Sequence, residues 1–401
     1  MITELAHGVY WVGVTDWNLR HFHGHEYSTH SGTTYNAYLI VDDRTVLVDT
    51  VWEPFAEDLL ANIREIVDPA QIDFVIANHG EIDHAGGLPL VMREAANAEI
   101  VVSKRGAHSI EGYYHQPWRF RTVCTGDRMQ IGAHELVFIE APMLHWPDSM
   151  FTYLTGHHLL FSNDAFGQHY ASAGHFNDDV DQHELYGEAL KYYANILTPF
   201  SDLVLKKIDE ILALNLPVEM IAPAHGVIWR ADPLQIVTQY QTWARQMPEP
   251  RAVVVYDTMW QATRRMAEAI GEGLLESGVN FTLQNLAVTD RNDVLAEIFR
   301  VRLLVVGSPT MNRGILPSLS PLLTDLKGLR FKHKLGAAFG SYGWHAESVT
   351  QIEAHLSQCG ISVIQPGITC QWQPSDDDLT RCRQFGRDLG EAVRQPLLVE
   401  A

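Results

Sequence analysis

One cluster of charged and imidazole side chains, placed directly after an apolar run, constrains the fold more than any other feature. The segment Asn78–Gly86 reads NHGEIDHAG and follows the predicted strand Phe74–Ala77. A loop at the end of a strand can turn several side chains to one point, whereas a helix spreads them around its circumference. Gly80, Gly86 and Gly87 give such a loop the backbone freedom it needs. The segment therefore predicts a metal site at the end of a strand rather than a solvated polar turn.

Three isolated residues of the ligand type stand in the same context. His145, Asp164 and His225 each lie just beyond an apolar run that predicts a strand. In layered α/β folds, this edge of the sheet is where sites are built. Each residue alone would be explained as structural, but together they are predicted to complete one site. The expected ligand set is His79, Glu81, Asp83, His84, His145, Asp164 and His225.

The segment Met247-Pro248-Glu249-Pro250 predicts a linker between two domains, 1–247 and 251–401. The second part alternates apolar runs with helical patterns, which favours a doubly wound parallel sheet. The first part mixes short strands with helices, which favours an α/β sandwich. The expected strands are 8–14, 35–41, 45–49, 74–77, 135–140, 159–161, 220–222, 252–256, 303–307 and 334–339, and the expected helices are 54–67, 264–275 and 348–358.

Composition excludes several classes of function. The 401 residues carry a formal charge of −20, so nucleic acid and anionic membranes are poor partners. The four cysteines form no C-x-x-C pair, which argues against a rubredoxin module and suits a reducing cytoplasm. We see no signal peptide and no apolar stretch long enough for a membrane span. The expected location is therefore cytoplasmic.

The ligand pattern resembles that of the metallo-β-lactamase superfamily, H-x-H-x-D-H followed by distant His, Asp and His. Glu81 stands where the second His is expected, and this exchange is the mark of the flavodiiron protein family. The resemblance covers the whole chain, and segments 142–150, 161–170 and 192–200 are similar to the flavorubredoxin branch. It implies an N-terminal metallo-β-lactamase-like αββα sandwich followed by a C-terminal flavodoxin-like domain.

The resemblance implies two non-haem iron ions. Four imidazoles and three carboxylates suit iron or manganese better than the nitrogen- and sulfur-rich sets typical of zinc. Asp164 would bridge the ions, and Asp83 and Glu81 could exchange roles. One iron would take His79, Glu81 and His145, and the other Asp83, His84 and His225.

A second site is predicted in the C-terminal part. The loop Asp257–Thr263 joins a predicted strand to a helix, and its hydroxyls and N–H groups at the helix N-terminus could cradle a phosphate. An ordinary capped helix is the alternative. The loop resembles the flavodoxin phosphate loop, and the segments 307–314 and 340–344 follow the next two strands. The implied FMN ligands are Thr258, Met259, Trp260, Gln261, Ala262, Thr263, Ser308, Pro309, Thr310, Met311, Asn312, Ser341, Tyr342, Gly343 and Trp344.

A flavin beside a diiron site implies a terminal reductase that converts nitric oxide to nitrous oxide, dioxygen to water, or both. By resemblance, His25, Tyr27 and Tyr193 would act on the bound gas, although the His-rich loop could instead be solvated surface. The resemblance also implies a separate rubredoxin-type electron donor and a head-to-tail homodimer or dimer of dimers. The alternatives are a zinc-dependent hydrolase with a flavodoxin-like appendage and a non-catalytic electron carrier.

Overall fold

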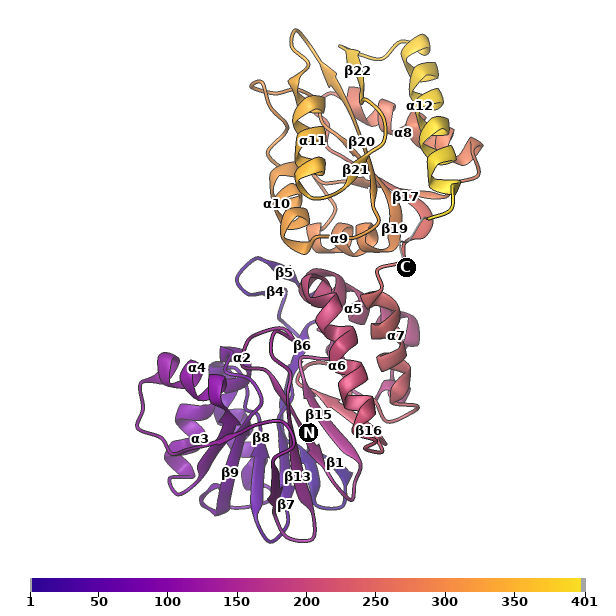
Figure 1. The fold of residues 1–401 in the computed structure, drawn as a ribbon. Coiled ribbons are helices and arrows are strands. Elements are labelled where there is room, and N and C mark those ends of the chain that lie inside the picture. The colour runs from indigo at the N-terminus through magenta and orange to yellow at the C-terminus, as the bar shows by residue number, and fades with distance from the viewer. Residues whose placement is uncertain (1, 398–401) are drawn as a thin grey trace. The chain divides into compact units, whose positions relative to one another are not determined.

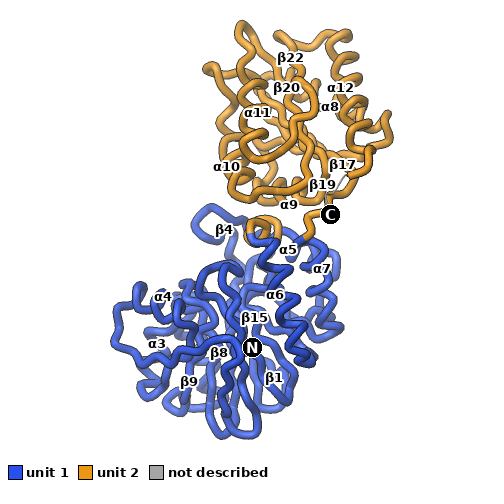
Figure 2. Tube along the Cα trace, in the orientation of Figure 1, with its two compact units in different colours: residues 1–192, 200–244 blue, residues 193–199, 245–401 orange. Residues whose placement is uncertain are grey.

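The computed structural model describes residues 2–397 and divides into two compact units. The first contains residues 1–192 and 200–244, and the second contains 193–199 and 245–401 (Figure 2). Met247 and Pro248 of the predicted linker lie outside any helix or strand, whereas Glu249 and Pro250 already belong to strand β17 (Glu249–Tyr256). The domain limits of 1–247 and 251–401 stay a prediction.

The first unit is a sandwich of two sheets. Its core lies between them, where Ile76 and Val101 of one sheet pack with Phe138 and Phe161 of the other. The seven-stranded sheet has the order β1 (Thr3–Ala6), β2 (Val9–Trp11), β7 (Tyr38–Val41), β8 (Thr45–Val48), β9 (Ile72–Ala77), β10 (Glu99–Ser103), β11 (Phe120–Val123). The five-stranded sheet has the order β12 (Arg128–Gln130), β13 (Glu135–Glu140), β14 (Met150–Leu154), β15 (Leu159–Asn163), β16 (Met220–Pro223).

Helices cover the outer faces of both sheets, which completes the αββα architecture (Figure 1). Helices α3 and α4 lie on the side of the seven-stranded sheet, and α6 and α7 on the side of the five-stranded sheet. The helices of this unit are α1 (Ala56–Arg64), α2 (Ile82–Ala85), α3 (Leu88–Glu94), α4 (Lys104–Tyr114), α5 (Gln182–Tyr192), α6 (Ser201–Ala213) and α7 (Leu234–Ala244). Two small hairpin-like pairs complete it: β3 (Val14–Asp16) with β6 (Thr33–Tyr35), and β4 (His21–Phe22) with β5 (Tyr27–Ser28).

Each of the two predicted strands 8–14 and 35–41 forms two shorter strands. Both are interrupted where Asn36 and Gly13 lie opposite each other. The chain leaves the ladder at Asn36, whose side-chain amide donates to the carbonyl oxygens of Pro223 and Gly226 at 2.8 and 3.0 Å. Opposite it, Gly13 lies so close to this backbone that an added Cβ would come within 2.2 Å of the Tyr35 carbonyl oxygen. At this interruption, Asn36 therefore holds the loop that carries His225.

The second unit is a parallel sheet with helices on both faces. Alternate residues of its central strands, such as Val254 and Val305, pack against α8 and α12, while α10 and α11 lie on the other face (Figure 1). The strand order is β18 (Phe281–Asn285), β17, β19 (Val301–Gly307), β20 (Leu335–Tyr342), β21 (Ser362–Val363), with β22 (Ile368–Gln371) also beside β20. The helices are α8 (Ala262–Glu276), α9 (Arg291–Arg300), α10 (Leu319–Leu329), α11 (Glu347–Gln358) and α12 (Asp376–Arg394).

The predicted α/β fold class, a sandwich followed by a doubly wound parallel sheet, is confirmed. Among the described residues, no helix combines the length and apolar character that a bilayer span needs.

Candidate metal centre and cofactor pocket

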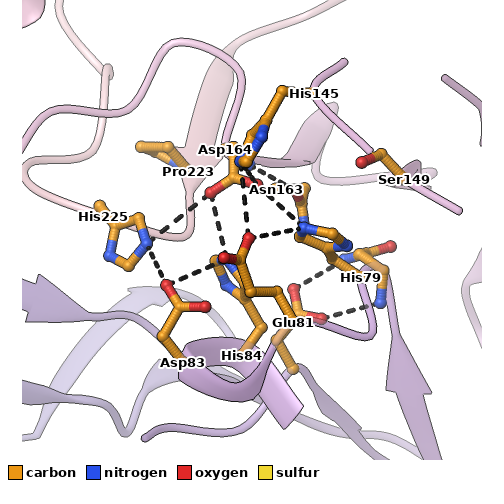
Figure 3. A network of polar contacts seen from close by, with 12 residues as sticks. His79, Glu81, Asp83, His84, His145, Ser149, Asn163, Asp164, Pro223 and His225 are labelled. Carbon is orange, nitrogen blue, oxygen red and sulfur yellow. Dashed lines mark hydrogen bonds and ion pairs between the residues drawn. The ribbon is translucent and has the colours of Figure 1, made fainter. Parts of the chain in front are cut away.

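All seven predicted ligand residues meet at one edge of the sandwich (Figure 3). They come from the segments that follow β9, β13, β15 and β16, with Asp83 and His84 on the short helix α2. Strands β13, β15 and β16 run in one direction, since β13 and β15 are both antiparallel to β14 and β16 is parallel to β15. Their carboxyl ends therefore lie at a common edge, as the sequence argument requires.

The carboxylate of Asp164 lies between two pairs of imidazoles (Figure 3). Its Oδ2 is 3.7 Å from Nε2 of His79 and 3.5 Å from Nε2 of His145. Its Oδ1 is 3.1 Å from Nε2 of His84 and 3.7 Å from Nε2 of His225. Each oxygen thus faces a different pair, which is the arrangement of a carboxylate that bridges two metal ions.

Each imidazole pair has its own second carboxylate. Oε2 of Glu81 lies 3.1 Å from Nε2 of His79 and 3.6 Å from Nε2 of His145. Oδ2 of Asp83 lies 3.3 Å from Nε2 of His84 and 3.0 Å from Nε2 of His225. The two sets can each enclose one ion, and the groups His79–Glu81–His145 and Asp83–His84–His225 have their ligand atoms within 4.8 Å of one another.

The far nitrogens of two imidazoles are held by other groups. Nδ1 of His79 is 3.2 Å from Asp148, and Nδ1 of His225 is 2.7 Å from the carbonyl oxygen of Thr34. Such contacts fix the ring and leave Nε2 free to bind a metal. Asp148 also accepts a hydrogen bond from the N–H of Gly80 at 2.9 Å. A Cβ on Gly80 would come within 2.8 Å of that carboxylate, so this glycine serves close approach rather than an unusual backbone angle.

Two carboxylate oxygens at the centre of the cluster are buried without a hydrogen-bond partner among the described residues. They are Oδ1 of Asp83 and Oδ2 of Asp164. Buried polar atoms in native proteins are almost always satisfied, so two such oxygens in one buried cluster have the character of cation ligands. The residues present therefore fit a pair of metal ions.

Two carboxylates of the cluster, Asp164 and Glu81, are held ionised. Burial opposes the charge of Asp164, but His84, His145 and His79 outweigh it and keep its pKa well below the usual range. Burial also opposes the charge of Glu81, but hydrogen bonds from His23 and His79 lower its pKa. Negative oxygen donors in a buried site attract cations and bind hard metal ions such as iron or manganese.

The loop before the cluster is anchored by a buried carboxylate that the sequence analysis missed. Asp49 accepts hydrogen bonds from the backbone and side-chain N–H groups of Asn78 at 2.8 and 3.0 Å. Asn78 in turn accepts a hydrogen bond from Thr152 at 2.7 Å. Burial raises the pKa of Asp49 to about 6, although His84 and Asn78 lower it. The backbone of Asp49 has a φ of 57°, which persists only because these contacts hold it.

The second unit contains a pocket of about 610 Å³ at the carboxyl ends of β17, β19 and β20. The first residue of α8, Ala262, lies in its wall, so the helix N-terminus faces the space. Trp344 and Trp372 lie on its rim with ring centroids 6.3 Å apart. Oγ1 of Thr258 is buried and has no hydrogen-bond partner among the described residues. A phosphate at the helix N-terminus and a planar ring between aromatic side chains would fit this pocket.

Comparison with known proteins finds a family match in each half of the chain. Residues 33–226 match the ODP family of beta lactamases, and residues 254–386 match the flavodoxin family. A nitric oxide reductase of Moorella thermoacetica is 50% identical over 391 residues, which is 97% of this chain and 98% of that protein. The flavodiiron protein of Giardia intestinalis has a TM-score of 0.94 at 34% identity, covering 98% of this chain and 97% of its own.

The chain belongs to the flavodiiron protein family. The rubredoxin oxygen:oxidoreductase of Desulfovibrio gigas is also similar, with a TM-score of 0.95 at 35% identity and 98% and 99% of the two chains covered. The family resemblance drawn from the exchange at Glu81 is thereby confirmed.

Two of the three gas-pocket residues predicted for this flavodiiron chain do not lie at the cluster. His25 is exposed and packs against His21, whereas His23 reaches Oε1 of Glu81 at 2.8 Å. Tyr193 packs on Phe299 within the second unit. The structure does not bring these two residues to the cluster, and their roles toward the bound gas stay predictions.

Tyr192, the neighbour of Tyr193, is the tyrosine at the cluster, where its hydroxyl donates to Oδ1 of Asp164 at 3.2 Å. Burial and the nearby carboxylate of Asp164 raise its pKa well above 10, so it stays protonated. Tyr27 is buried, with its ring 6.4 Å from that of Tyr192, and its role toward the gas stays a prediction. His169 was not predicted, although its ring lies 4.9 Å from that of His225.

The predicted flavin ligands divide into pocket wall and pocket support. The wall contains Met259, Trp260, Ala262, Pro309, Thr310, Asn312, Ser341, Tyr342, Gly343 and Trp344. Five predicted ligands do not line the pocket: Thr258, Gln261, Thr263, Ser308 and Met311. Thr263, for example, is hydrogen-bonded to Ser341 of the wall at 2.9 Å. Arg313, His345, Trp372 and Gln373 also line the pocket and were missed. Trp372 and Gln373 follow β22, a strand too short and too mixed in composition to be seen in the sequence.

Proposed function

We propose that this flavodiiron chain reduces nitric oxide to nitrous oxide at two iron ions, with electrons from an FMN in its second unit. The observation that carries the proposal is Asp164, whose two oxygens each face a separate pair of imidazoles. The full-length likeness to the Moorella thermoacetica nitric oxide reductase supports the choice of substrate. The reaction joins two nitric oxide molecules with two electrons and two protons to give nitrous oxide and water.

The proposed ligands follow from the two sets of contacts. His79, Glu81 and His145 would hold one ion, and Asp83, His84 and His225 the other, with Asp164 shared. When bound, the iron ions would supply redox electrons and open coordination positions for the gas. The role of the chain is to orient the ligands: Asp148 holds the ring of His79, and the protonated hydroxyl of Tyr192 orients Asp164.

Dioxygen is the second candidate substrate. The structural match to the Desulfovibrio gigas rubredoxin oxygen:oxidoreductase covers nearly the whole chain and favours it. Both gases are small, and both would meet the same seven residues. We therefore propose reduction of dioxygen to water as an accompanying activity whose rate must be measured beside that of nitric oxide.

The cofactor and the partners are also proposals. FMN would fill the pocket of the second unit, with its phosphate at the N-terminus of α8 and its ring beside Trp344. A separate rubredoxin-type protein would deliver electrons, and a head-to-tail homodimer or dimer of dimers would bring the flavin of one chain to the iron of another. The cytoplasm is the proposed location, because three of the four cysteines are buried free thiols.

A zinc hydrolase, the alternative that the sequence leaves open, has less support. Glu81 replaces a nitrogen donor by an oxygen donor, and the full-length relative is named a reductase. The non-catalytic carrier also loses support, because all seven ligand-type residues are present and converge.

The test combines metal analysis with gas consumption. The purified protein should contain about two iron ions and one FMN per chain, and its reduced form should remove nitric oxide at an electrode. His79→Asn should abolish this activity and leave the flavin bound. The matched control is His108→Asn, since His108 is exposed on α4. Zinc in place of iron, or full activity of His79→Asn, would refute the proposal.

A further inference from the structure

An apolar pocket lies on the outer face of the five-stranded sheet, beneath α6 and α7 of the first unit. We name it the α6–α7 pocket. It has a volume of about 180 Å³. Its wall contains only apolar side chains: Leu160, Phe166, Ile208, Ile211, Leu212, Leu216, Pro217, Val218, Ile221, Leu234 and Val237. Its floor is formed by the paired residues Leu160 of β15 and Ile221 of β16, which are almost fully buried.

This floor belongs to the two strands that carry Asp164 and His225. Phe166, in the wall of the pocket, stands only two residues after Asp164. Its N–H donates to Tyr240 at 2.9 Å, and its carbonyl oxygen accepts from the indole of Trp229 at 2.9 Å. The pocket is thus built on the same rigid turn as the metal cluster.

The ring of Phe166 is held in the pocket wall by an unusual backbone conformation. Its φ is 68°, a left-handed conformation that a bulky residue rarely adopts. The ring packs against Tyr240 at a centroid distance of 4.7 Å and is only 4% exposed. Such strain is retained where surrounding contacts fix it. It places an apolar surface between the pocket and the Asp164 turn.

We propose that the α6–α7 pocket binds the apolar gas that the enzyme consumes and holds it close to the metal cluster. The inference rests on the proposed function, because it takes nitric oxide or dioxygen as the substrate. Both gases are diatomic and nearly apolar, so they partition from water into apolar space. An apolar cavity of about 150 Å³ can bind xenon or benzene, and the volume here is similar. The side chains of this wall offer a polar ligand no hydrogen-bond partner.

The mouth of the pocket is accessible from solvent. Leu212 on α6 and Leu234 on α7 line it and are 49% and 44% exposed. Gas can therefore enter without unfolding of the helices. A larger side chain at Leu212 would close the mouth while its own ring stays partly in water, so the variant should fold.

The first experiment uses xenon as the probe, in crystals of the metal- and flavin-loaded protein under xenon pressure. Xenon density in the α6–α7 pocket of the wild type, and its loss in Leu212→Trp, are expected. The matched control is Leu203→Trp, because Leu203 lies on the same helix with 41% exposure but outside the pocket. A wild-type pocket without xenon would overturn the proposal. This readout needs no turnover.

The second experiment measures nitric oxide consumption by the same variants. We expect about a threefold rise in the KM for nitric oxide in Leu212→Trp with kcat unchanged, and wild-type values in Leu203→Trp. An unchanged KM in Leu212→Trp would overturn the role in gas supply even if xenon binds. A wild type that consumes neither gas would instead overturn the proposed function. This failure can be told apart from a failure of the pocket proposal, because xenon binding is measured separately.

Discussion

The metal cluster and the cofactor pocket of this chain are built on opposite principles. His79 and Asp164 are 0% and 1% exposed, and their neighbours hold them from several sides. Trp260 and Trp344 at the pocket are 82% and 79% exposed, and much of the pocket consists of loops after strands. The side chains of a buried cluster are in place before the metal ions bind. The loss of one of these side chains should therefore disable the whole cluster. An exposed pocket distributes its contacts, so single changes should have graded effects.

The largest effect is expected for Asp164→Asn, which would break the cluster at its centre. An amide has one oxygen and no negative charge, so it cannot serve both imidazole pairs. Activity should fall by about a thousandfold, and iron content should drop. Metal analysis and nitric oxide consumption check this. Asp209→Asn, an exposed change on α6, is the control. Retention of both irons in Asp164→Asn would show that the ligands of the cluster bind metal independently of one another.

A smaller effect is expected where a group supports the cluster from behind. Asp148→Asn would keep the hydrogen bond from Gly80 but weaken the hold on Nδ1 of His79. Iron affinity should fall by about 10–100-fold, as for other partners of metal ligands. A competition assay with a chelator measures it. If Asp148→Asn matched Asp164→Asn in severity, the distinction between ligand and support would fail.

The sequence predicts those parts of the cluster whose residues lie close together in the chain. His79, Glu81, Asp83 and His84 stand within six residues of one another, so any fold that ends a strand there brings them together. Distant residues could be added only because each follows an apolar strand. Asp148 could not be found in this way, since its role depends on how the β13–β14 connection folds back on Gly80.

The local sequence does not determine which of two nearby residues, such as Tyr192 and Tyr193, faces the metal cluster. Tyr192 ends α5 and Tyr193 begins a π-helical turn, and adjacent helical residues point about 100° apart. Which tyrosine reaches Asp164 is set by the packing of the helix and not by the sequence nearby. Likewise, the left-handed backbone of His23, with a φ of 52°, turns the hairpin so that His23 and not His25 reaches Glu81.

At the exposed pocket, Trp344→Ala should weaken FMN binding by about tenfold, since it removes one aromatic contact and leaves the helix N-terminus intact. Flavin fluorescence during titration of the flavin-free protein measures the affinity. Trp17→Ala, an exposed tryptophan of the first unit, is the control. Complete loss of flavin in Trp344→Ala would mean that this pocket is as interdependent as the metal cluster.

The smallest effect is expected for a carboxylate–imidazole pair that lies away from the metal cluster. Asp42 follows β7 at the opposite edge of the sheet and lies 2.8 Å from Nδ1 of His134. Burial opposes its charge, but the hydrogen bonds from His134 and from the backbone N–H groups of Ala133 and Asp43 lower its pKa to about 2. Because the pKa is depressed on folding, this stabilisation is present above pH 3.8 and is lost as the pH falls towards 2.

Asp42→Asn should therefore lower the free energy of unfolding at neutral pH by about 1–2 kcal/mol, with iron content and gas consumption unchanged. Between pH 3.8 and 2, the difference from the wild type should shrink, because protonation removes the same charge. Denaturant titration of the two proteins across this range measures it. A loss of iron in Asp42→Asn would show that the two edges of the sandwich are coupled, and the cluster could no longer be treated as organised by its own neighbours alone.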